Sequence, residues 1–362
     1  MRVTVVGGGA VALITAVECV LSGHQVAVVD QGPLPAVRGA SSGRRRITAA
    51  LDPADPAATS DGVRAQERWG VLEGLLGTRF HERTGALTLL PEPAVGAAAQ
   101  SVGSAGGAVR ALAADELAQR CPQLRLDGGL GGVLEERAGV LLTDRVAAAA
   151  VGWLRWQPGV ELHPYRPVAS VDGESASVRL VNGDVLRGDA VLVVAGARSR
   201  GLLPPVLSEG TTLRRRTLIS CRVPRGQAAA WARGPAVLVP GLGIGLVPPV
   251  AGSALLVDAD GAPERADGGL LPGFGPDWIA ATEYRHTLSF AAPGGPGPGP
   301  VELGGRGRAL AYAVCDSSVL SAPLVARELV DRLAGHAGHS RLAVPVPVPA
   351  SVPASVPVPV LR

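Results

Sequence analysis

The stretch RVTVVGGGAVALITAVECVL, residues 2–21, and the stretch QVAVVD, residues 25–30, decide the fold. Residues 2–6 and 25–30 are short and almost continuously apolar, which is the pattern of buried parallel strands. The glycines at 7–9 indicate a tight turn, and residues 10–21 have the composition of a helix. The sequence therefore predicts one βαβ unit at the start of the chain.

Within this unit, Gly7, Gly9 and Ala12 have the spacing of a dinucleotide-binding fingerprint. Gly7 permits the tight turn, Gly9 lets a pyrophosphate approach the helix N-terminus, and Ala12 lets the helix lie close to the strand. Asp30, at the end of the second strand, accepts the ribose hydroxyls and disfavours the 2′-phosphate of NADP. The motif alone does not separate FAD from NAD. The cofactor-binding residues expected in this unit are Gly7, Gly9, Ala10, Ala12, Asp30 and Gln31.

The composition is that of a folded enzyme. The chain has 362 residues, and a Rossmann-type protein of this size carries a second domain over its cofactor. Hydrophobic residues make up 47% and charged residues 18%, which favours a sizeable core over disorder. The net charge of +3 comes with no basic tract that interleaves aromatic residues, so nucleic acid is not the indicated partner. All 34 basic residues are arginine, because the sequence contains no lysine.

The cysteines and the N-terminus indicate the compartment. Cys19, Cys121, Cys221 and Cys315 are widely spaced and form no C-x-x-C pair, so neither a metal site nor a disulfide framework is indicated. The first residues form a strand and a glycine turn, which is not the pattern of a signal peptide. No apolar stretch is long enough to span a membrane. We therefore expect reduced thiols in a cytoplasmic protein; the sequence does not indicate its oligomeric state.

Later segments suggest how the chain is organised. Residues 160–186 read as short strands around an Asn182-Gly183-Asp184 turn, and residues 190–195 as a further buried strand. Residues 217–256 have the pattern of an antiparallel sheet. The remaining expected elements are a helix at 65–76, a Gly/Pro-rich loop at 293–300, a helix at 319–334 and a polyproline-like stretch at 344–360.

The predicted fold class is α/β, a Rossmann-like FAD-binding domain interleaved with an antiparallel-sheet substrate domain. The FAD-binding domain is expected to be discontinuous, over residues 1–80, 140–215 and 300–340. The substrate domain is then expected to take up residues 81–139 and 216–299. Residues 344–362 are expected to form a disordered tail rich in Pro and Val.

Three segments carry a resemblance to a known family: GASSGRRRI at residues 39–47, PVASV at 167–171 with VLVVAGARSRGL at 191–202, and EYRH at 283–286. They resemble segments of the D-amino-acid oxidase-like FAD-dependent oxidoreductases, which include glycine and sarcosine oxidases. The resemblance covers roughly residues 1–335 and implies non-covalent FAD. The further residues that it implies at the cofactor are Ser41, Ser42, Arg46, Val168, Ala195, Gly196, Ser317 and Ser318.

The same resemblance implies a substrate role for two arginines. Arg285 corresponds to an arginine that faces the substrate carboxylate, and Arg46 is the second candidate for that contact. A planar guanidinium suits a carboxylate because it donates two parallel hydrogen bonds. Tyr284 and His286 alternate with Arg285, so we expect them to point to the other face of the strand.

The chain departs from the family pattern at two places. The family has a Gly-His-Gly type of turn under the flavin, whereas this chain has CDSS at residues 315–318. The sarcosine-type oxidases of the family activate oxygen with a lysine, and this chain has none. An arginine is one substitute for that fixed positive charge, and transfer of the electrons to another acceptor is the alternative.

These observations predict an FAD-dependent oxidase or dehydrogenase that oxidises a small amine or amino acid by hydride transfer to flavin N5. Two alternatives stay open. One is a 2-hydroxy-acid or alcohol dehydrogenase on the same fold, with His286 as the base for the hydroxyl proton. The other is a flavin-binding partner protein that has lost catalysis. The composition rich in Ala, Gly and Arg suggests a GC-rich bacterial genome and a specialised pathway such as antibiotic biosynthesis.

Overall fold

The computed structural model describes residues 1–37, 45–122, 124, 129–203, 213–223, 225–260, 283–293, 302–306, 310–314 and 319–333. The expected loop at 293–300 lies outside these residues except for Pro293, which ends a strand, and the expected tail at 344–362 lies outside them entirely.

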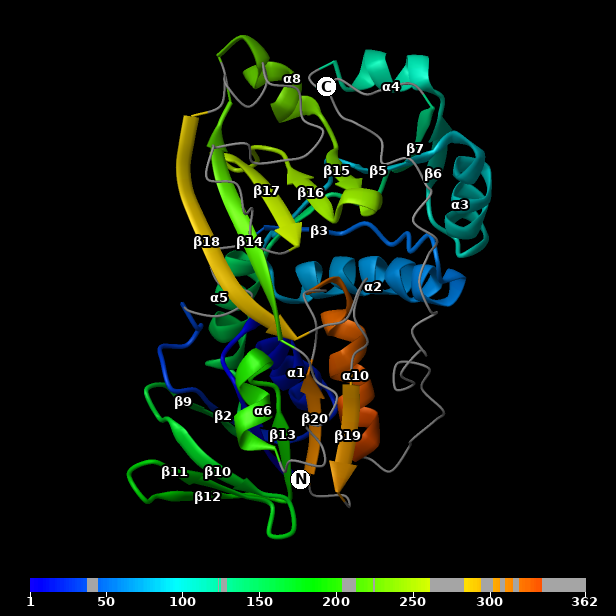
Figure 1. Ribbon diagram of the computed structural model, residues 1–362. Helices are drawn as coiled ribbons and strands as arrows, with labels where there is room; N and C mark the ends of the chain where they lie inside the picture. Colours follow the sequence, from blue (N-terminus) through cyan, green and yellow to red (C-terminus); the bar gives the residue numbers. More distant parts are fainter. Residues whose placement is uncertain are drawn as a thin grey trace.

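The first sheet is the predicted Rossmann sheet, which occupies the lower half of Figure 1. Its strands are parallel except for the edge strand β19, which is antiparallel to its neighbour β20. The apolar runs at 2–6 and 25–29 form its centre, as the sequence predicts. In spatial order the strands are β19 (Glu302–Arg306), β20 (Leu310–Val314), β13 (Ala190–Val193), β1 (Arg2–Val6), β2 (Gln25–Val29) and β9 (Val160–His163).

Both faces of this sheet are covered because successive strand residues point to opposite sides. Val3 and Val5 belong to an apolar cluster with residues of four helices, one of which is the helix at 56–75, whereas Val6 packs with a small antiparallel sheet on the other face. The expected hairpin around Asn182 is confirmed as the turn between two strands of that small sheet. The covering elements are α1 (Ala10–Leu21), α5 (Thr143–Leu154), α10 (Ala322–Leu333), β10 (Val168–Asp172), β11 (Ser177–Leu180) and β12 (Val185–Arg187).

The second sheet has eight strands and fills the upper half of Figure 1. Its strands are antiparallel except for β5 and β15, which run parallel. In spatial order the strands are β18 (Glu283–Pro293), β14 (Leu213–Arg222), β17 (Leu255–Asp260), β16 (Ile244–Val247), β15 (Ala236–Val239), β5 (Ala86–Pro91), β7 (Leu130–Glu135) and β6 (Val109–Leu112).

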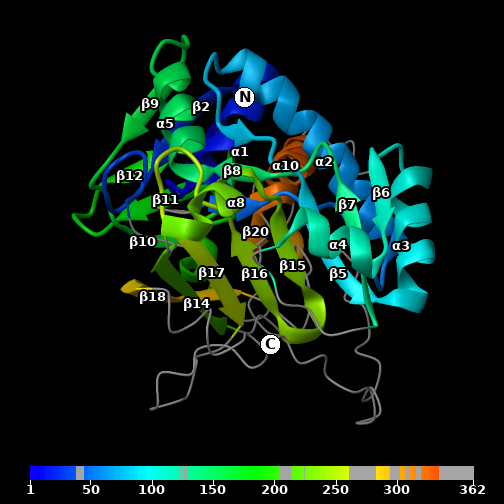
Figure 2. The ribbon, with the colours of Figure 1, turned by 90° about the horizontal axis from the view of Figure 1, so that it is seen from above.

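Short helices connect and cover this second sheet. Figure 2 shows α3 (Glu92–Ser104) beside β6 at one edge, and α4 (Ala114–Arg120) follows it in the chain. The all-strand prediction for 217–256 is wrong at η2 (Arg225–Gln227) and α8 (Ala228–Arg233). The local sequence AAAWAR favours a helix because alanine and arginine are strong helix formers, and the turn buries Trp231.

The helix α2 (Pro56–Leu75) lies between the two sheets (Figure 1). It begins nine residues before the expected start at 65, because Asp55 accepts hydrogen bonds from the N–H groups of Ala57 and Ala58 at 2.8 and 3.2 Å and Pro56 fits the first helical position. Beside α2 lies a three-stranded sheet of β3 (Arg45–Ile47), β8 (Val140–Leu142) and β4 (His81–Glu82).

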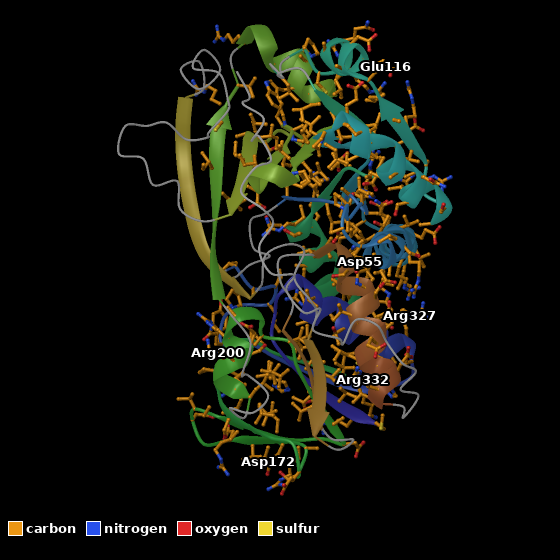
Figure 3. The ribbon with its side chains drawn as sticks, turned by 45° about the vertical axis from the view of Figure 1, so that its right-hand side comes forward. Asp55, Glu116, Asp172, Arg200, Arg327 and Arg332 are labelled. Atoms are coloured by element: carbon orange, nitrogen blue, oxygen red, sulfur yellow. The ribbon has the colours of Figure 1, made fainter. Side chains whose placement is uncertain are left out.

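Figure 3 marks the long axis of the molecule, with Glu116 of α4 at one end, Asp172 of β10 at the other and Asp55 between them. The predicted α/β class, with a Rossmann-like part interleaved with a second sheet, is confirmed. The strands of the two large sheets fall within the segments expected for two domains, except that β14 begins at Leu213; the domain boundaries stay a prediction. Among the described helices, none is long and apolar enough to cross a membrane.

The glycine turn after β1 yields a first prediction. Gly7 has φ +132°, and a Cβ there would collide with the carbonyl oxygen of Val194. We expect Gly7→Ala to lower the free energy of unfolding by about 3 kcal/mol or more, through overpacking and backbone strain together. Gly23 is the matched control, because its φ is +78° and no atom lies within 4 Å of a Cβ there.

In urea unfolding, Gly23→Ala should cost only about 1 kcal/mol, the strain of the left-handed conformation. Equal losses in the two variants would show that the contact with Val194 does not constrain the turn.

Candidate cofactor and substrate site

Three strand ends meet at one edge of the Rossmann sheet. The N–H of Gly7 donates to the carbonyl of Val29 at 2.9 Å, and the N–H of Val194 donates to the carbonyl of Val6 at 2.9 Å. A Cβ at Gly7 would also lie 3.3 Å from that of Ala12, so α1 passes close to the turn. The structure therefore brings Gly7 and Ala12 together as the fingerprint predicts, at the edge where ligands bind in open α/β sheets.

The N-terminus of α1 points to this edge. Gly9 is the N-cap residue, its carbonyl accepts the N–H of Leu13 at 3.0 Å, and Ala10 is the first helical residue. The first turn of α1 contains no acidic side chain, so the positive end of the helix dipole faces no carboxylate of its own turn. This arrangement fits the pyrophosphate of a dinucleotide.

Gly8 is a residue of the glycine turn whose packing role the sequence argument missed. A Cβ there would lie 2.6 Å from Leu34 Cδ2 and 3.0 Å from Asp30 Cγ. The N–H of Ala36 donates to the carbonyl of Gly8 at 3.0 Å. The segment after β2 thus closes onto the glycine turn, and only glycine leaves room for it. The signal was present in the run of three glycines, of which the motif uses two.

Asp30 lies directly after β2, where the prediction places it. Its Oδ1 accepts the N–H of Gly32 at 2.8 Å, which orients the carboxylate, and its backbone carbonyl accepts the N–H of Arg166 at 2.8 Å. Val168 packs on the cluster that contains Val6 and Val29. The structure therefore brings Asp30 and Val168 to the same side of the edge, and Gln31 beside them is exposed.

Ala195 and Gly196 follow β13 at this edge, and both are half-buried. Gly196 begins the short helix η1 (Gly196–Arg198) with φ +58°, a conformation that favours glycine. The N–H of Ala195 donates to the buried Ser199 hydroxyl at 2.9 Å. Ser199 begins α6 (Ser199–Leu202), so this hydrogen bond fixes the backbone of the second glycine segment.

The expected cofactor residues Ser41, Ser42, Ser317 and Ser318 lie outside the described residues. Their flanking elements are nevertheless in contact: β3, which follows the first pair, touches η4 (Val319–Ser321), which follows the second. Trp69 of α2 donates its indole N–H to the carbonyl of Leu320 at 2.9 Å. The strand that carries Arg46 is thereby held near the carboxyl end of β20.

Arg46 lies on β3, which contacts β16 of the second sheet and η4. It is 5% exposed, and its Nη1 donates to Asp258 Oδ2 of β17 at 3.1 Å. The neighbouring Arg45 donates to the carbonyl of Ala254 at 3.4 Å, and burial lowers the pKa of its guanidinium. Sequence reasoning missed Asp258, because this partner is 212 residues away from Arg46.

A buried carboxylate holds the chain after β3. Glu135 of β7 accepts the N–H groups of Ala50 and Leu51 at 2.8 and 3.1 Å, and the side-chain amide of Gln66 at 3.1 Å. Burial raises the pKa of Glu135, and these donors act in the opposite direction by stabilising the ionised form. Gln66 also donates to the carbonyl of Thr48. Glu135 thus fastens the Arg46 segment to the second sheet.

Thr48 and His81 complete this buried cluster. Thr48 Oγ1 accepts the N–H of Gly139 at 2.8 Å and lies 3.0 Å from His81 Nε2. Either group can be the donor in this contact, because the hydroxyl keeps a second lone pair after it accepts the Gly139 N–H. Burial lowers the pKa of His81, which favours the neutral imidazole, and its contacts give it a structural role.

The structure places Arg285 on the edge strand β18, two strands away from β17, which carries Asp258. Arg285 lies near the start of β18, whereas Figure 1 shows the other end of that strand beside α6. The residue of β18 in line with Asp258 is Leu288, because both pair with Leu218.

The strand pairing is irregular at Arg285, so the expected alternation around it stays a prediction. Ser220 pairs with His286 and Cys221 with Tyr284, so Arg285 is the extra residue of a β-bulge. A bulge interrupts the two-residue period of a strand, so the pairing does not show whether Tyr284 and His286 point away from Arg285.

Among the described residues, no cluster of His, Cys, Asp and Glu suits a metal ion.

The Glu135 cluster predicts a large loss of stability on truncation. We expect Glu135→Ala to lower the free energy of unfolding by about 3 kcal/mol or more, because three buried N–H donors lose their acceptor. Glu135→Gln retains an acceptor oxygen and should cost less. Urea unfolding of both variants measures the difference, and a loss below about 0.5 kcal/mol for Glu135→Ala would contradict the role of this carboxylate.

His81 predicts a pH dependence. Burial, with Arg83, lowers its folded-state pKa, while Glu73 and Glu82 oppose the shift. Below about pH 6.5 the unfolded chain therefore takes up a proton that the folded His81 does not, so stability is lost as the pH falls. His81→Gln keeps an acceptor for Thr48 without this titration. The expected result is a smaller loss of stability between about pH 7.5 and about pH 5.5 for His81→Gln than for the wild type; equal slopes would contradict it.

Comparisons with known proteins agree with this geometry. The family described as DAO, FAD dependent oxidoreductase, matches residues 2–292. Peroxisomal sarcosine oxidase of Mus musculus is 29% identical over 147 residues, which are 40% of this chain. The alignment spans 37% of the length of the mouse protein.

Solved structures show the same fold over nearly the whole chain. Glycine oxidase from Bacillus cereus has a TM-score of 0.70 at 15% identity and covers 93% of this chain and 96% of its own. A modified fructosyl peptide oxidase from Aspergillus nidulans has a TM-score of 0.73 at 16% identity, covering 93% of this chain and 91% of its own. The predicted resemblance and fold class are confirmed. This chain therefore belongs to the DAO family of FAD-dependent oxidoreductases, with FAD as its cofactor.

Proposed function

We propose that this chain oxidises a small amine or amino acid. The observation that carries the proposal is the buried guanidinium of Arg46, on a strand that contacts the second sheet and η4. The names of the relatives, a sarcosine oxidase and a glycine oxidase, support the same substrate class.

The residues that hold FAD in this proposal follow from the edge geometry. The turn from Gly7 to Gly9 and the first turn of α1 receive the pyrophosphate, and Asp30 receives the ribose hydroxyls. Val168 lies on the adenine side. The residues proposed for the remainder of the cofactor are Ser41, Ser42, Arg46, Ala195, Gly196, Ser317 and Ser318. No covalent attachment is part of the proposal.

Bound FAD supplies the redox chemistry by accepting a hydride at its N5 atom. The protein contributes orientation and a site shielded from water. The Arg46 guanidinium donates hydrogen bonds to the polar end of the substrate, and Asp258 with the Glu135 cluster fixes the strand from which it does so. No side-chain base is required when the amine binds in its neutral form, which agrees with the structural role of His81.

The cellular setting is a further part of the proposal. The described cysteines Cys19, Cys121 and Cys221 are free and buried, which supports a reducing, cytoplasmic compartment. The lysine-free composition supports a GC-rich bacterium, and a private substrate fits specialised metabolism. Neighbouring genes of a specialised pathway would support this setting, and a housekeeping amino-acid operon would count against it.

An absorbance spectrum of the purified protein, followed by anaerobic titration, tests the reaction. The panel contains amino acids, secondary amines and 2-hydroxy acids. We expect flavin bands that bleach with an amine or amino acid and persist with hydroxy acids. Rapid return of the flavin bands in air identifies an oxidase. Slow return indicates that the electrons pass to another acceptor.

Bleaching by hydroxy acids alone would replace the proposal with a hydroxy-acid dehydrogenase. Flavin that stays oxidised with every compound would indicate a partner protein without catalysis.

A further inference from the structure

The Arg46–Asp258 ion pair joins a buried arginine to a half-buried carboxylate. The side chains are 6% and 13% exposed, and Arg46 Nη1 lies 3.1 Å from Asp258 Oδ2. Arg46 is the buried arginine among those whose burial the structure describes, and the sequence contains no lysine. Asp258 supplies a counter-charge to this arginine.

The backbone holds this pair in place. Asp258 pairs with Leu218 on one side and with Gly245 on the other, so it lies in an interior strand. A Cβ at Gly245 would lie 3.3 Å from Ile47 Cδ1 and 3.9 Å from Asp258 Cβ. The absence of a side chain at Gly245 therefore lets β3 approach the sheet at Asp258. The two charged groups face each other because of this close approach.

A charged substrate has to compete with this arrangement. A free carboxylate at Arg46 would place two carboxylates, which repel each other, on one guanidinium. A carbonyl oxygen of an amide, ester or thioester accepts a hydrogen bond from Arg46 without adding charge. A carbonyl oxygen at Arg46 therefore leaves the summed charge of Arg46 and Asp258 at zero.

We propose that Asp258 is a specificity-determining residue, which makes Arg46 bind an uncharged acyl carbonyl in place of a free carboxylate. The inference rests on the proposed amine oxidation and narrows it: the substrate is an amine whose neighbouring acyl group is an amide, ester or thioester. Asp258 acts through Arg46, so it selects the substrate by charge and takes no part in the transfer of electrons.

Equilibrium titration of the oxidised holoenzyme tests this with two unreactive probes, N-acetylglycine and its neutral counterpart N-acetylglycinamide. The wild type should bind the amide more tightly. In Asp258→Asn, the ratio of the two dissociation constants should shift toward the carboxylate by about tenfold or more, because Arg46 loses its competing anion. Asp258→Glu restores the negative charge and should restore the preference of the wild type.

Glu18→Gln is the matched control. Glu18 forms a buried ion pair with Arg68 at 2.6 Å between α1 and α2, so the control also removes a buried carboxylate but leaves Asp258 in place. The ratio of the two dissociation constants in Glu18→Gln should equal that of the wild type, even if the substitution lowers the stability of the protein. FAD content measured for every variant identifies those that have lost the fold.

An unchanged ratio in Asp258→Asn, a tighter carboxylate in the wild type, or an equal shift in Glu18→Gln would each overturn the inference. The proposed amine oxidation fails separately, through an absence of flavin bleaching by any amine. The binding ratio does not depend on turnover, so the two failures are distinguishable.

Discussion

The close approach of Gly7 to the end of β13 is the constraint on which the rest of the site depends. Gly7 takes φ +132° where a side chain would meet the Val194 carbonyl, and hydrogen bonds from Gly7 and Val194 join three strand ends. This geometry aims α1 at the edge where Asp30 and Gly196 also lie. A dinucleotide site results from backbone placement, and the side chains contribute mainly by being small or by orienting Asp30.

Two carboxylates hold the Arg46 segment against the second sheet. Glu135 holds the backbone after β3, and Asp258 holds the side chain of Arg46 on β3 itself. A carboxylate withdrawn from water is costly unless its partners are well placed, so both contacts constrain the position of β3 strongly. The short strand β3 is thereby tied to the second sheet at two points, and Arg46 has a counter-charge at Asp258.

The sequence predicts those parts of the fold that local pattern determines. The first strand and helix lie where the apolar runs and the glycine turn place them, because every signal is within thirty residues. Local pattern could not reveal Asp258 or Glu135, whose partners are 212 and 85 residues away. Arg285 shows the same limit, since the bulge around it is a property of its pairing with β14. Gly8 was missed because the dinucleotide-binding fingerprint accepts any residue between its first two glycines.

The central claim is that the strand-end edge holds FAD. Calorimetric titration of the cofactor-free protein with FAD and, separately, with NAD tests this most directly. The account predicts stoichiometric binding of FAD that NAD does not displace, because the family and the surrounding elements specify a flavin dinucleotide. Binding of NAD without binding of FAD would contradict it.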